Sequence, residues 1–386
     1  MSTLRTGPGR QRSRKNLFNF SQNTLDKSWF LLYPLASTHE CTLRKRMKLM
    51  ETSRERVTRA DVAKAAGVSE TIVSYVVNNN RYVAKEKRQR VEEAIRALNY
   101  RPNNMARALK GKKSNQILFI ADHITNEYFS SIVSAMDQYA YEAGYLISLC
   151  ANRNTPEFVS QVISRQYDGI VISSASFPEE YVSQFIQAGI PVVVFRRRLH
   201  LKPMEHAALM ETGLYTGARK AVRHLMEKGC RNIVYVDRIS ARGHVSPADD
   251  MRFSGFVDEM KDSGFSVGPD NIVCGCRSQE ELEEELRQHF QKGTAADGIF
   301  GRNDTLACIA MTTAQQMGLR VPEDIRIIGF DDSSISRLCS PKLSTLGFQQ
   351  NEIAKTTIDM LSQMMNGQQP EDVDFDTVLI ERESTL

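Results

Sequence analysis

Residues 66–79, with the sequence AGVSETIVSYVVNN, carry a row of hydrogen-bonding side chains at helical spacing behind a single glycine. On a helix that starts after this glycine, Glu70, Thr71, Ser74 and Tyr75 would lie on the outer side. Their carboxylate, hydroxyl and phenol groups donate and accept hydrogen bonds, so the chemistry they offer is recognition of another molecule. Two helices of an ordinary core are the alternative interpretation of this stretch.

Sequence patterns that indicate catalysis or metal binding are absent. The chain has no paired catalytic carboxylates and no GxSxG, HExxH or Walker motif. Its seven cysteines form no CxxC pair, and Cys274-Gly-Cys276 has a spacer too short for the usual zinc pairs. We therefore expect no enzyme, no cofactor and no metal site. We interpret the cysteines as reduced, mostly buried thiols of a cytoplasmic protein.

The charge of the chain is unevenly distributed. The net charge is only +4, but residues 1–113 hold 25 Lys and Arg against 9 Asp and Glu, a net charge of +16. The remaining residues carry a net charge of −12. This asymmetry indicates a basic end that meets a polyanion and an acidic body that does not.

Residues 1–56 differ in composition from the rest of the chain. Their main apolar run, WFLLYPLA at 29–36, is shorter and later than the apolar region of a secretory signal. We expect a disordered tail or an upstream extension that the native protein lacks, with Met47 and Met50 as alternative starts. An organelle transit peptide is the less favoured reading. No run in the chain approaches the roughly 18 apolar residues of a membrane span.

The elements that would position the recognition residues begin at Val57. Thr58-Arg-Ala-Asp61 has the form of a capping box, and Ser69 is a good N-cap for a helix over 70–77. With a further helix over 85–98, residues 57–102 are predicted to form a helix-turn-helix domain. Arg101-Pro102 breaks the helical pattern, and residues 103–113 have the composition of a linker with a short helix inside it.

From residue 114 to 386, apolar strands and amphipathic helices alternate, which is the doubly wound α/β pattern. The expected strands are 116–121, 145–149, 169–173, 191–195, 232–236, 298–300 and 325–330. The expected helices are 128–143, 156–166, 213–228, 249–262, 303–317 and 349–366. The length favours two Rossmann-like lobes, the first of about 114–228 and 348–369 and the second of about 229–347 and 370–386.

Two sets of motifs follow one another along the chain. The head set comprises VTRADVAKAAGVS, Val73-Ser74, Val76, Asn78, Tyr82-Val83, LNYRPN and Ala106-Arg107. The body set comprises DGIVIS, GIPVVVF, AVRHLMEKG, RFSG, GRNDTLA, GLRVPEDIRIIGFDD and PKLSTL. In this order, from about Val57 to the final ERESTL, the chain resembles the lactose-repressor (LacI) family of bacterial transcription regulators.

The resemblance implies a fold and a mode of action. The helix-turn-helix head would enter the major groove of DNA, and the hinge helix would lie in the minor groove. The body would resemble a type I periplasmic binding protein, with two lobes joined by three crossovers and an effector cleft between them. Members usually act as homodimers, sometimes as tetramers, on near-palindromic double-stranded operators.

The family pattern also assigns DNA contacts to residues of this sequence. Glu70, Thr71 and Tyr75 would face the bases, where Glu accepts from cytosine and Thr contacts either a polar edge or the thymine methyl group. A carboxylate that only stabilises the helix N-terminus is the alternative for Glu70. The expected phosphate-contacting and neighbouring head residues are Thr58, Ser69, Ser74 and Asn78.

In the hinge, Leu109 falls on the family's leucine wedge, which inserts between base pairs and kinks the duplex. An apolar contact between the linker and the body is the alternative for Leu109. The neighbouring family positions are Asn103, Met105, Ala106 and Lys110. So short a helix should be marginal alone, which makes it a switch that DNA orders and an effector shifts.

The body motifs suggest effector contacts at the carboxyl ends of strands, where ligands of open α/β sheets bind. Arg252 matches the family's effector-holding arginine, and Tyr128-Phe129 match an aromatic pair of the other lobe. Asn303 and Asp331 follow strands directly, although Asn303 would serve equally as a helix cap.

The sequence departs from the family pattern at the predicted rim of the cleft. Arg196-Arg-Arg198 stands where Asp-Arg is usual, which indicates an anionic effector bound with Arg196 or a different use of the site. A merely charged surface is the alternative. Glu211-Thr212 stand near the common Asp-Asn. Tyr75 replaces the usual Arg or His, and Ala84 replaces a hydroxyl cap. These departures affect the expected effector and operator, not the architecture.

We therefore expect a cytoplasmic bacterial repressor, bound at the nucleoid when on DNA, whose operator affinity is controlled by a sugar or sugar derivative. The sequence leaves open whether the effector releases DNA or strengthens binding. A family member controlled by a partner protein is one alternative, as in catabolite control. A solute-binding protein is another, but the basic head and the lack of a signal peptide argue against it.

Overall fold

A computed structural model describes residues 57–101, 113–122, 124–125, 127–199, 204, 206–291 and 296–386. The chain divides into two compact units between residues 102 and 103, and each unit is described by itself. All six described cysteines are free. Within the described ranges, no helix is long and apolar enough to cross a membrane, and no three metal-binding side chains gather as a candidate site.

The N-terminal unit consists of three short helices, α2 (Arg59–Ala66), α3 (Glu70–Asn78) and α4 (Lys85–Ala97). The predicted capping box is present, since Thr58 and Asp61 exchange hydrogen bonds between their side chains and backbone N–H groups. The turn needs Gly67, whose φ of 62° lies in the left-handed region, and Ser69 then caps α3. The core is made of Tyr100 and of small and branched residues, namely Val62, Ala63, Ala66, Val73, Val76, Val91 and Ala94.

The first lobe of the body is built on a six-stranded sheet in the order β11-β5-β4-β3-β1-β2, with every neighbouring pair parallel. Its strands are β1 (Gln116–Ala121), β2 (Leu146–Ala151), β3 (Gly169–Ser173), β4 (Val192–Arg196), β5 (Ala207–Glu211) and β11 (Val373–Asp374). Its helices are α6 (Glu127–Glu142), α7 (Pro156–Ser164), α8 (Glu179–Gln187) and α14 (Gln350–Met365).

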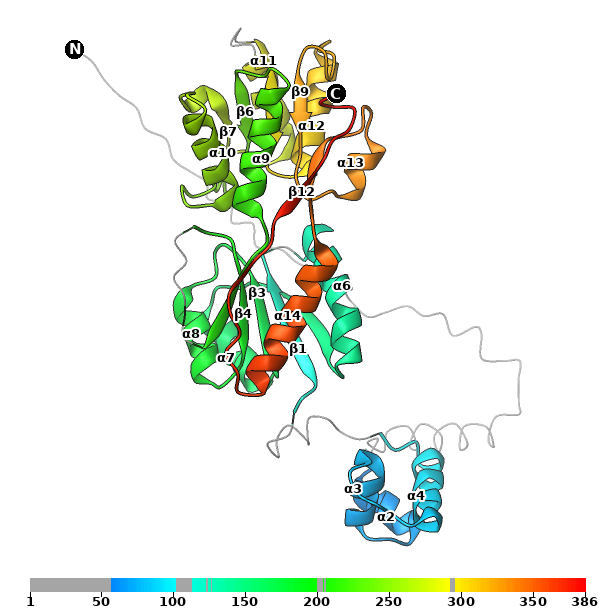
Figure 1. Cartoon of the computed structure of the whole chain (residues 1–386). Helices are drawn as coiled ribbons and strands as arrows, with labels where there is room; N and C mark the ends of the chain where they lie inside the picture. The colour runs from blue at the N-terminus through cyan, green and yellow to red at the C-terminus, as the bar shows by residue number, and fades with distance from the viewer. Residues whose placement is uncertain are drawn as a thin grey trace, which may run out of the picture. The chain divides into compact units, whose positions relative to one another are not determined.

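Both faces of this sheet are buried, which explains the nearly continuous apolar strands. Ile117 and Phe119 of β1 point to the face that α6 and α14 cover, while Leu118 and Ile120 point to the face that α7 and α8 cover (Figure 1).

The second lobe contains a four-stranded parallel sheet in the order β7-β6-β8-β9. Its strands are β6 (Ile233–Val236), β7 (Ile272–Val273), β8 (Gly298–Gly301) and β9 (Arg326–Ile328). Its helical segments are α9 (Leu214–Glu227), α10 (Met251–Asp262), η2 (Pro269–Asn271), α11 (Gln279–Gln291), α12 (Asp304–Gln316) and α13 (Ser334–Leu338). The antiparallel pair β10 (Thr345–Phe348) and β12 (Thr377–Ile380) completes the described elements.

The chain passes between the lobes three times, and two passages differ from the predicted boundaries (Figure 1). The sequence places residues 214–228 in the first lobe, but α9 packs in the second, against α10 and the buried rings of Tyr235, Phe300 and Phe330. The first passage therefore lies between β5 and α9. Similarly, β11 pairs with β5 of the first lobe, so the last passage falls between β11 and β12 and not near residue 370.

Candidate functional site

The outer face of α3 carries the residues that the sequence predicts for base recognition. Glu70 and Thr71 are exposed in its first turn. Tyr75 is half-buried, and its hydroxyl accepts a hydrogen bond of 3.3 Å from Arg81, whose guanidinium carbon lies 5.2 Å from the ring centre. A carboxylate, a hydroxyl and a phenol beside a cation therefore lie on one helix. This arrangement can hydrogen-bond to a polar surface.

The other predicted contacts of the head are partly engaged within it. The hydroxyls of Thr58 and Ser69 accept from backbone N–H groups of the helices they cap. The Asn78 amide donates to the carbonyl of Ser74 at 2.7 Å and to its hydroxyl at 3.1 Å, and Arg59 also approaches that hydroxyl, at 3.5 Å. Ser74 and Asn78 thus stabilise the shape of α3 through an interaction one helical turn apart.

The predicted hinge contacts lie outside the described residues. These are Asn103, Met105, Ala106, Leu109 and Lys110. Their proposed roles, including that of the leucine wedge, therefore stay predictions.

In the body, the predicted residues Arg252 and Asp331 form a buried ion pair of 2.6 Å. Arg252 is 4% exposed and Asp331 is 7% exposed. The Arg252 guanidinium carbon lies 4.4 Å from the centre of the Phe330 ring and 6.0 Å from that of Tyr128. Burial raises the pKa of Asp331 although Arg252 opposes the shift. Its backbone φ of 108° is strained for a residue other than glycine, which is typical of functional sites.

The predicted aromatic pair of α6 faces this ion pair from the first lobe. Tyr128 shares a buried hydrogen bond of 3.0 Å with Thr212, and its ring packs against Phe129 and Phe348. Over the rings of Tyr128 and Phe129 lies Arg197, which the sequence does not predict as an effector contact. The Arg197 guanidinium carbon is 5.4 Å from the Tyr128 ring centre and 5.5 Å from that of Phe129.

Asn303 and Asp304 have structural roles at the start of α12. Asn303 accepts from the backbone N–H of Leu306 at 3.0 Å, which is the cap function that the sequence allows as an alternative to ligand binding. Asp304 is 1% exposed and accepts from Thr345, at 2.5 Å, and from the hydroxyl and backbone N–H of Ser333. Burial and the nearby Asp331 raise the pKa of Asp304 to about 7.

The second lobe contains a second buried charge cluster, which the sequence motifs do not predict. Arg302 donates to both carboxylate oxygens of Asp250, at 2.7 and 2.8 Å, and also to Tyr235 and Ser246. Burial acts to raise the pKa of Asp250, but Arg302 outweighs it and holds the pKa below its usual range. Asp237 accepts from Ser246 in the same cluster. Two of these residues could have been predicted from their position in the sequence, because Asp237 and Arg302 directly follow strands β6 and β8.

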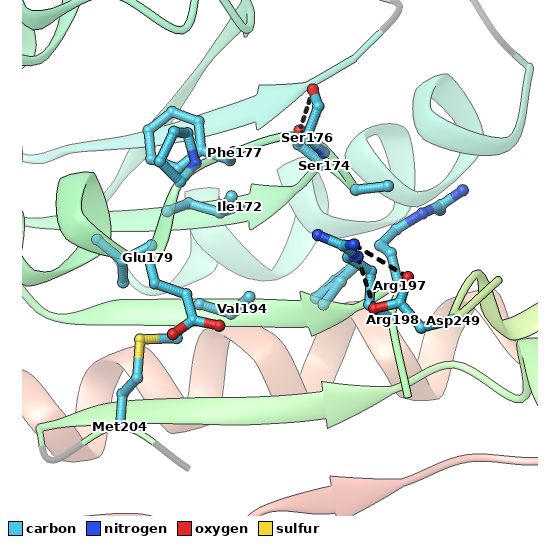
Figure 2. Close-up of a pocket in the computed structure, with 14 residues that line it drawn as sticks. Ile172, Ser174, Ser176, Phe177, Glu179, Val194, Arg197, Arg198, Met204 and Asp249 are labelled. Atoms are coloured by element: carbon cyan, nitrogen blue, oxygen red, sulfur yellow. Dashed lines mark hydrogen bonds and ion pairs between the residues drawn. The ribbon is translucent and has the colours of Figure 1, made fainter. Parts of the chain in front are cut away.

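A cavity of about 170 Å³ lies at the carboxyl ends of β3 and β4. The cavity is lined by Ile172, Ser174, Ala175, Ser176, Phe177, Pro178, Glu179, Val182, Val194, Phe195, Arg197, Arg198, Met204 and Asp249. Figure 2 shows Glu179 at one end and Arg197, Arg198 and Asp249 at the other. Asp249 comes from the second lobe and pairs with Arg198 at 2.9 Å, so the cavity reaches the contact between the lobes.

Arg196, the arginine that the sequence predicts for the effector, does not line this cavity. Its guanidinium lies 3.8 Å from Glu211 of the neighbouring strand, where β4 and β5 pair in register. Burial raises the pKa of Glu211, with Asp374 contributing and Arg196 opposing. The next residue, Arg197, lines the cavity instead.

The chain is similar to known proteins in both units. Residues 58–103 match a model of the lacI family of bacterial regulatory proteins, and residues 222–385 match a periplasmic binding protein-like domain. The HTH-type transcriptional repressor PurR of Pasteurella multocida is 30% identical over 311 residues, which cover 79% of this chain and 91% of that protein. The ribose operon repressor of Halalkalibacterium halodurans is 32% identical over 296 residues, which cover 74% and 83%.

Solved structures show the same likeness. A lac repressor dimer bound to operator and the anti-inducer ONPF is 25% identical, with a TM-score of 0.72, and covers 86% of this chain and 100% of that chain. The predicted fold, a helix-turn-helix head followed by two parallel α/β lobes, is therefore confirmed.

Proposed function

The chain belongs to the lacI family of bacterial regulatory proteins, and we propose that it is a repressor whose operator affinity is controlled by a small molecule bound between the lobes of its body. The observation that carries this proposal is the combination of two features in one chain. The head presents Glu70, Thr71 and Tyr75 on an exposed recognition helix. The body buries the Arg252–Asp331 pair against aromatic rings, and Arg197, which lies over the Tyr128 ring, lines a cavity.

The head supports DNA binding by charge as well as by shape. Residues 57–101 hold 9 Lys and Arg against 5 Asp and Glu, while residues from 114 onwards carry a net charge of −12. Phosphate contacts by such a basic unit would set affinity, and base contacts from α3 would set the preferred sequence. In this proposal, Leu109 and its neighbours in the hinge add a minor-groove contact.

A near-palindromic operator follows if the protein binds as a homodimer, because each head would read one half-site. The dimer is part of the proposal, as is a bacterial cytoplasmic location. A sugar or sugar derivative is the proposed class of effector. Solved relatives support this choice. One is a lac repressor bound to ONPG, and another is a periplasmic binding protein/LacI transcriptional regulator from Alkaliphilus metalliredigens in complex with D-xylulofuranose.

The test is selection of bound sequences from random double-stranded DNA by the purified full chain, at two salt concentrations. We expect enrichment of one near-palindromic motif that persists at the higher salt concentration. Affinity that shows no sequence preference and falls steeply with salt would overturn the proposal, because nonspecific binding comes from phosphate contacts alone.

A further inference from the structure

Among the described residues, Arg197 is buried without an anionic partner. The residue is 9% exposed, and within the described part of the chain its guanidinium forms no ion pair. Its Nη1 atom is shielded from solvent and donates no hydrogen bond to a described residue. The rings of Tyr128 and Phe129 give it a cation–π environment, which does not replace the hydrogen bonds that a guanidinium makes in water.

Two buried carboxylates near Arg197 are already paired with other arginines. Asp331 pairs with Arg252 at 2.6 Å, and Asp250 receives both donors of Arg302. Arg197 is close enough to lower the pKa of both Asp250 and Asp331, yet it bonds to neither. Three buried guanidinium groups therefore share this region, and Arg197 is the one whose charge has no carboxylate partner among the described residues.

The same residue lines the cavity at the carboxyl ends of β3 and β4, the edge at which ligands of parallel sheets bind. The lining also offers Ser176 and, at the other end of the cavity, Glu179 (Figure 2), and both side chains can bond to hydroxyl groups. The volume of about 170 Å³ is below the roughly 300–1,000 Å³ of sites for drug-sized ligands, which favours a compact molecule.

We propose that the effector is a small polyhydroxy anion, with a carboxylate or phosphate group held by Arg197 and hydroxyl groups directed toward Ser176 and Glu179. The planar guanidinium donates in a fork that matches either anionic group. The ligand would supply the missing anion. A neutral sugar of the same shape would therefore bind more weakly. This inference rests on the proposed function, because it assigns a chemical class to that effector.

The test is a thermal-shift assay on the full chain with D-gluconate, D-glucuronate, D-glucose 6-phosphate and inorganic phosphate, each matched in ionic strength and compared with neutral D-glucose. We expect at least one anion to raise the melting temperature by a few degrees or more, while D-glucose leaves it unchanged. A response to gluconate or glucuronate identifies a carboxylate ligand, and a response to the phosphates identifies a phosphate ligand.

Arg197→Met keeps an apolar side chain over the rings and should abolish the shift. Arg197→Lys keeps the positive charge but lacks the paired donors of a guanidinium, so it should show a smaller shift in melting temperature. This variant still tests the proposal if Arg197→Met fails to fold. Arg196→Met is the matched control, since Arg196 is adjacent but faces Glu211, and it should respond as the wild type does.

The proposal is overturned if D-glucose stabilises the protein as well as the anions do. It is equally overturned if no anion of the panel stabilises the wild type, or if the shift survives in Arg197→Met. Sequence selection by Arg197→Met separates this failure from that of the proposed function. A variant that selects the same DNA motif as the wild type leaves the regulator intact, whatever the ligand assay shows.

Discussion

Glu127 of the first lobe caps a helix of the second. Its carboxylate accepts hydrogen bonds from the backbone N–H of Ser334, at 2.8 Å, and from the Ser334 hydroxyl, at 2.9 Å. Ser334 begins α13, and the residue before it, Ser333, forms no side-chain cap with this helix and donates its hydroxyl to Asp304 instead. A carboxylate from the other lobe therefore stabilises this helix N-terminus, so the contact depends on how the lobes are placed.

Glu127→Ala should loosen this contact between the lobes. Loss of the hydrogen bond to the Ser334 backbone should cost about 1 kcal/mol locally, which corresponds to roughly fivefold faster amide exchange. Hydrogen exchange resolved at Ser334 measures the effect. Glu157→Ala, an exposed acid in the first turn of α7, is the control and should leave Ser334 unchanged. Equal exchange in both variants would show that Glu127 does not hold the lobes in solution.

The sequence predicted those elements whose pattern is local. The described helices of the head and the central strands of both sheets fall within a few residues of their predicted limits. The missed strands depend on distant partners. β5 has the weak strand sequence AALME and is held between β4 and β11, and β11 is only two residues that pair across more than 160 positions of sequence. α11 was hidden because its buried residues Leu282 and Leu286 stand in an acidic run.

The candidate site was predicted only where a motif marks it. Arg252 and Asp331 stand in motifs and meet in the structure. Arg197 stands in a run of three arginines, which on sequence grounds are exposed, and only packing over rings from α6 makes it buried. The choice between Arg196 and Arg197 depends on where strand β4 ends, because Arg196 is its last residue and pairs beside Glu211, while Arg197 follows the strand and lines the cavity.

Gly255→Ala should destabilise the second lobe by about 1–3 kcal/mol, because α9 and α10 cross closely there. A Cβ atom at this position would lie 2.5 Å from the backbone oxygen of Tyr215 and 2.8 Å from the Cβ of Ala218, so backbone must move. Urea unfolding measures the change. At Gly268, a Cβ atom would meet nothing within 4 Å, so Gly268→Ala is the matched control. Similar unfolding midpoints for the two variants would contradict the close crossing.

Asp304 should make the stability of the body depend on pH. Its pKa is raised from 3.8 to about 7 by burial and by Asp331, so the folded protein holds this proton more tightly than the unfolded chain does. The stabilisation is therefore fully present below about pH 4 and is lost as the pH rises to about 7. Within this window, the slope approaches about 1.4 kcal/mol per pH unit.

Asp304→Asn isolates this contribution, because other groups titrate over the same range. An amide resembles the protonated carboxyl group and does not ionise, so the variant should lose this fall in stability between about pH 4 and pH 7. Urea unfolding at several pH values gives the difference between the two proteins. A constant difference across the window would mean that Asp304 is already ionised at low pH in the folded state.

Thr71→Ala and Glu70→Ala should change which operator the protein prefers while leaving its fold intact. Both side chains are exposed in the first turn of α3 and contribute nothing to the core of the head. Loss of a base-edge contact should cost about 1–3 kcal/mol on the selected operator and almost nothing on random DNA. Titration of each variant against the selected operator and a scrambled duplex measures both quantities.

Glu92→Ala is the matched control, since Glu92 is an exposed acid on α4. If the Glu70 carboxylate acts only on the helix N-terminus, removing it should lower the melting temperature of the head and weaken binding to both duplexes. If Glu70 contacts a base, removing it should lower the affinity for the operator alone. The ratio of the two affinities therefore distinguishes base recognition from helix stabilisation, independently of how much stability each variant loses.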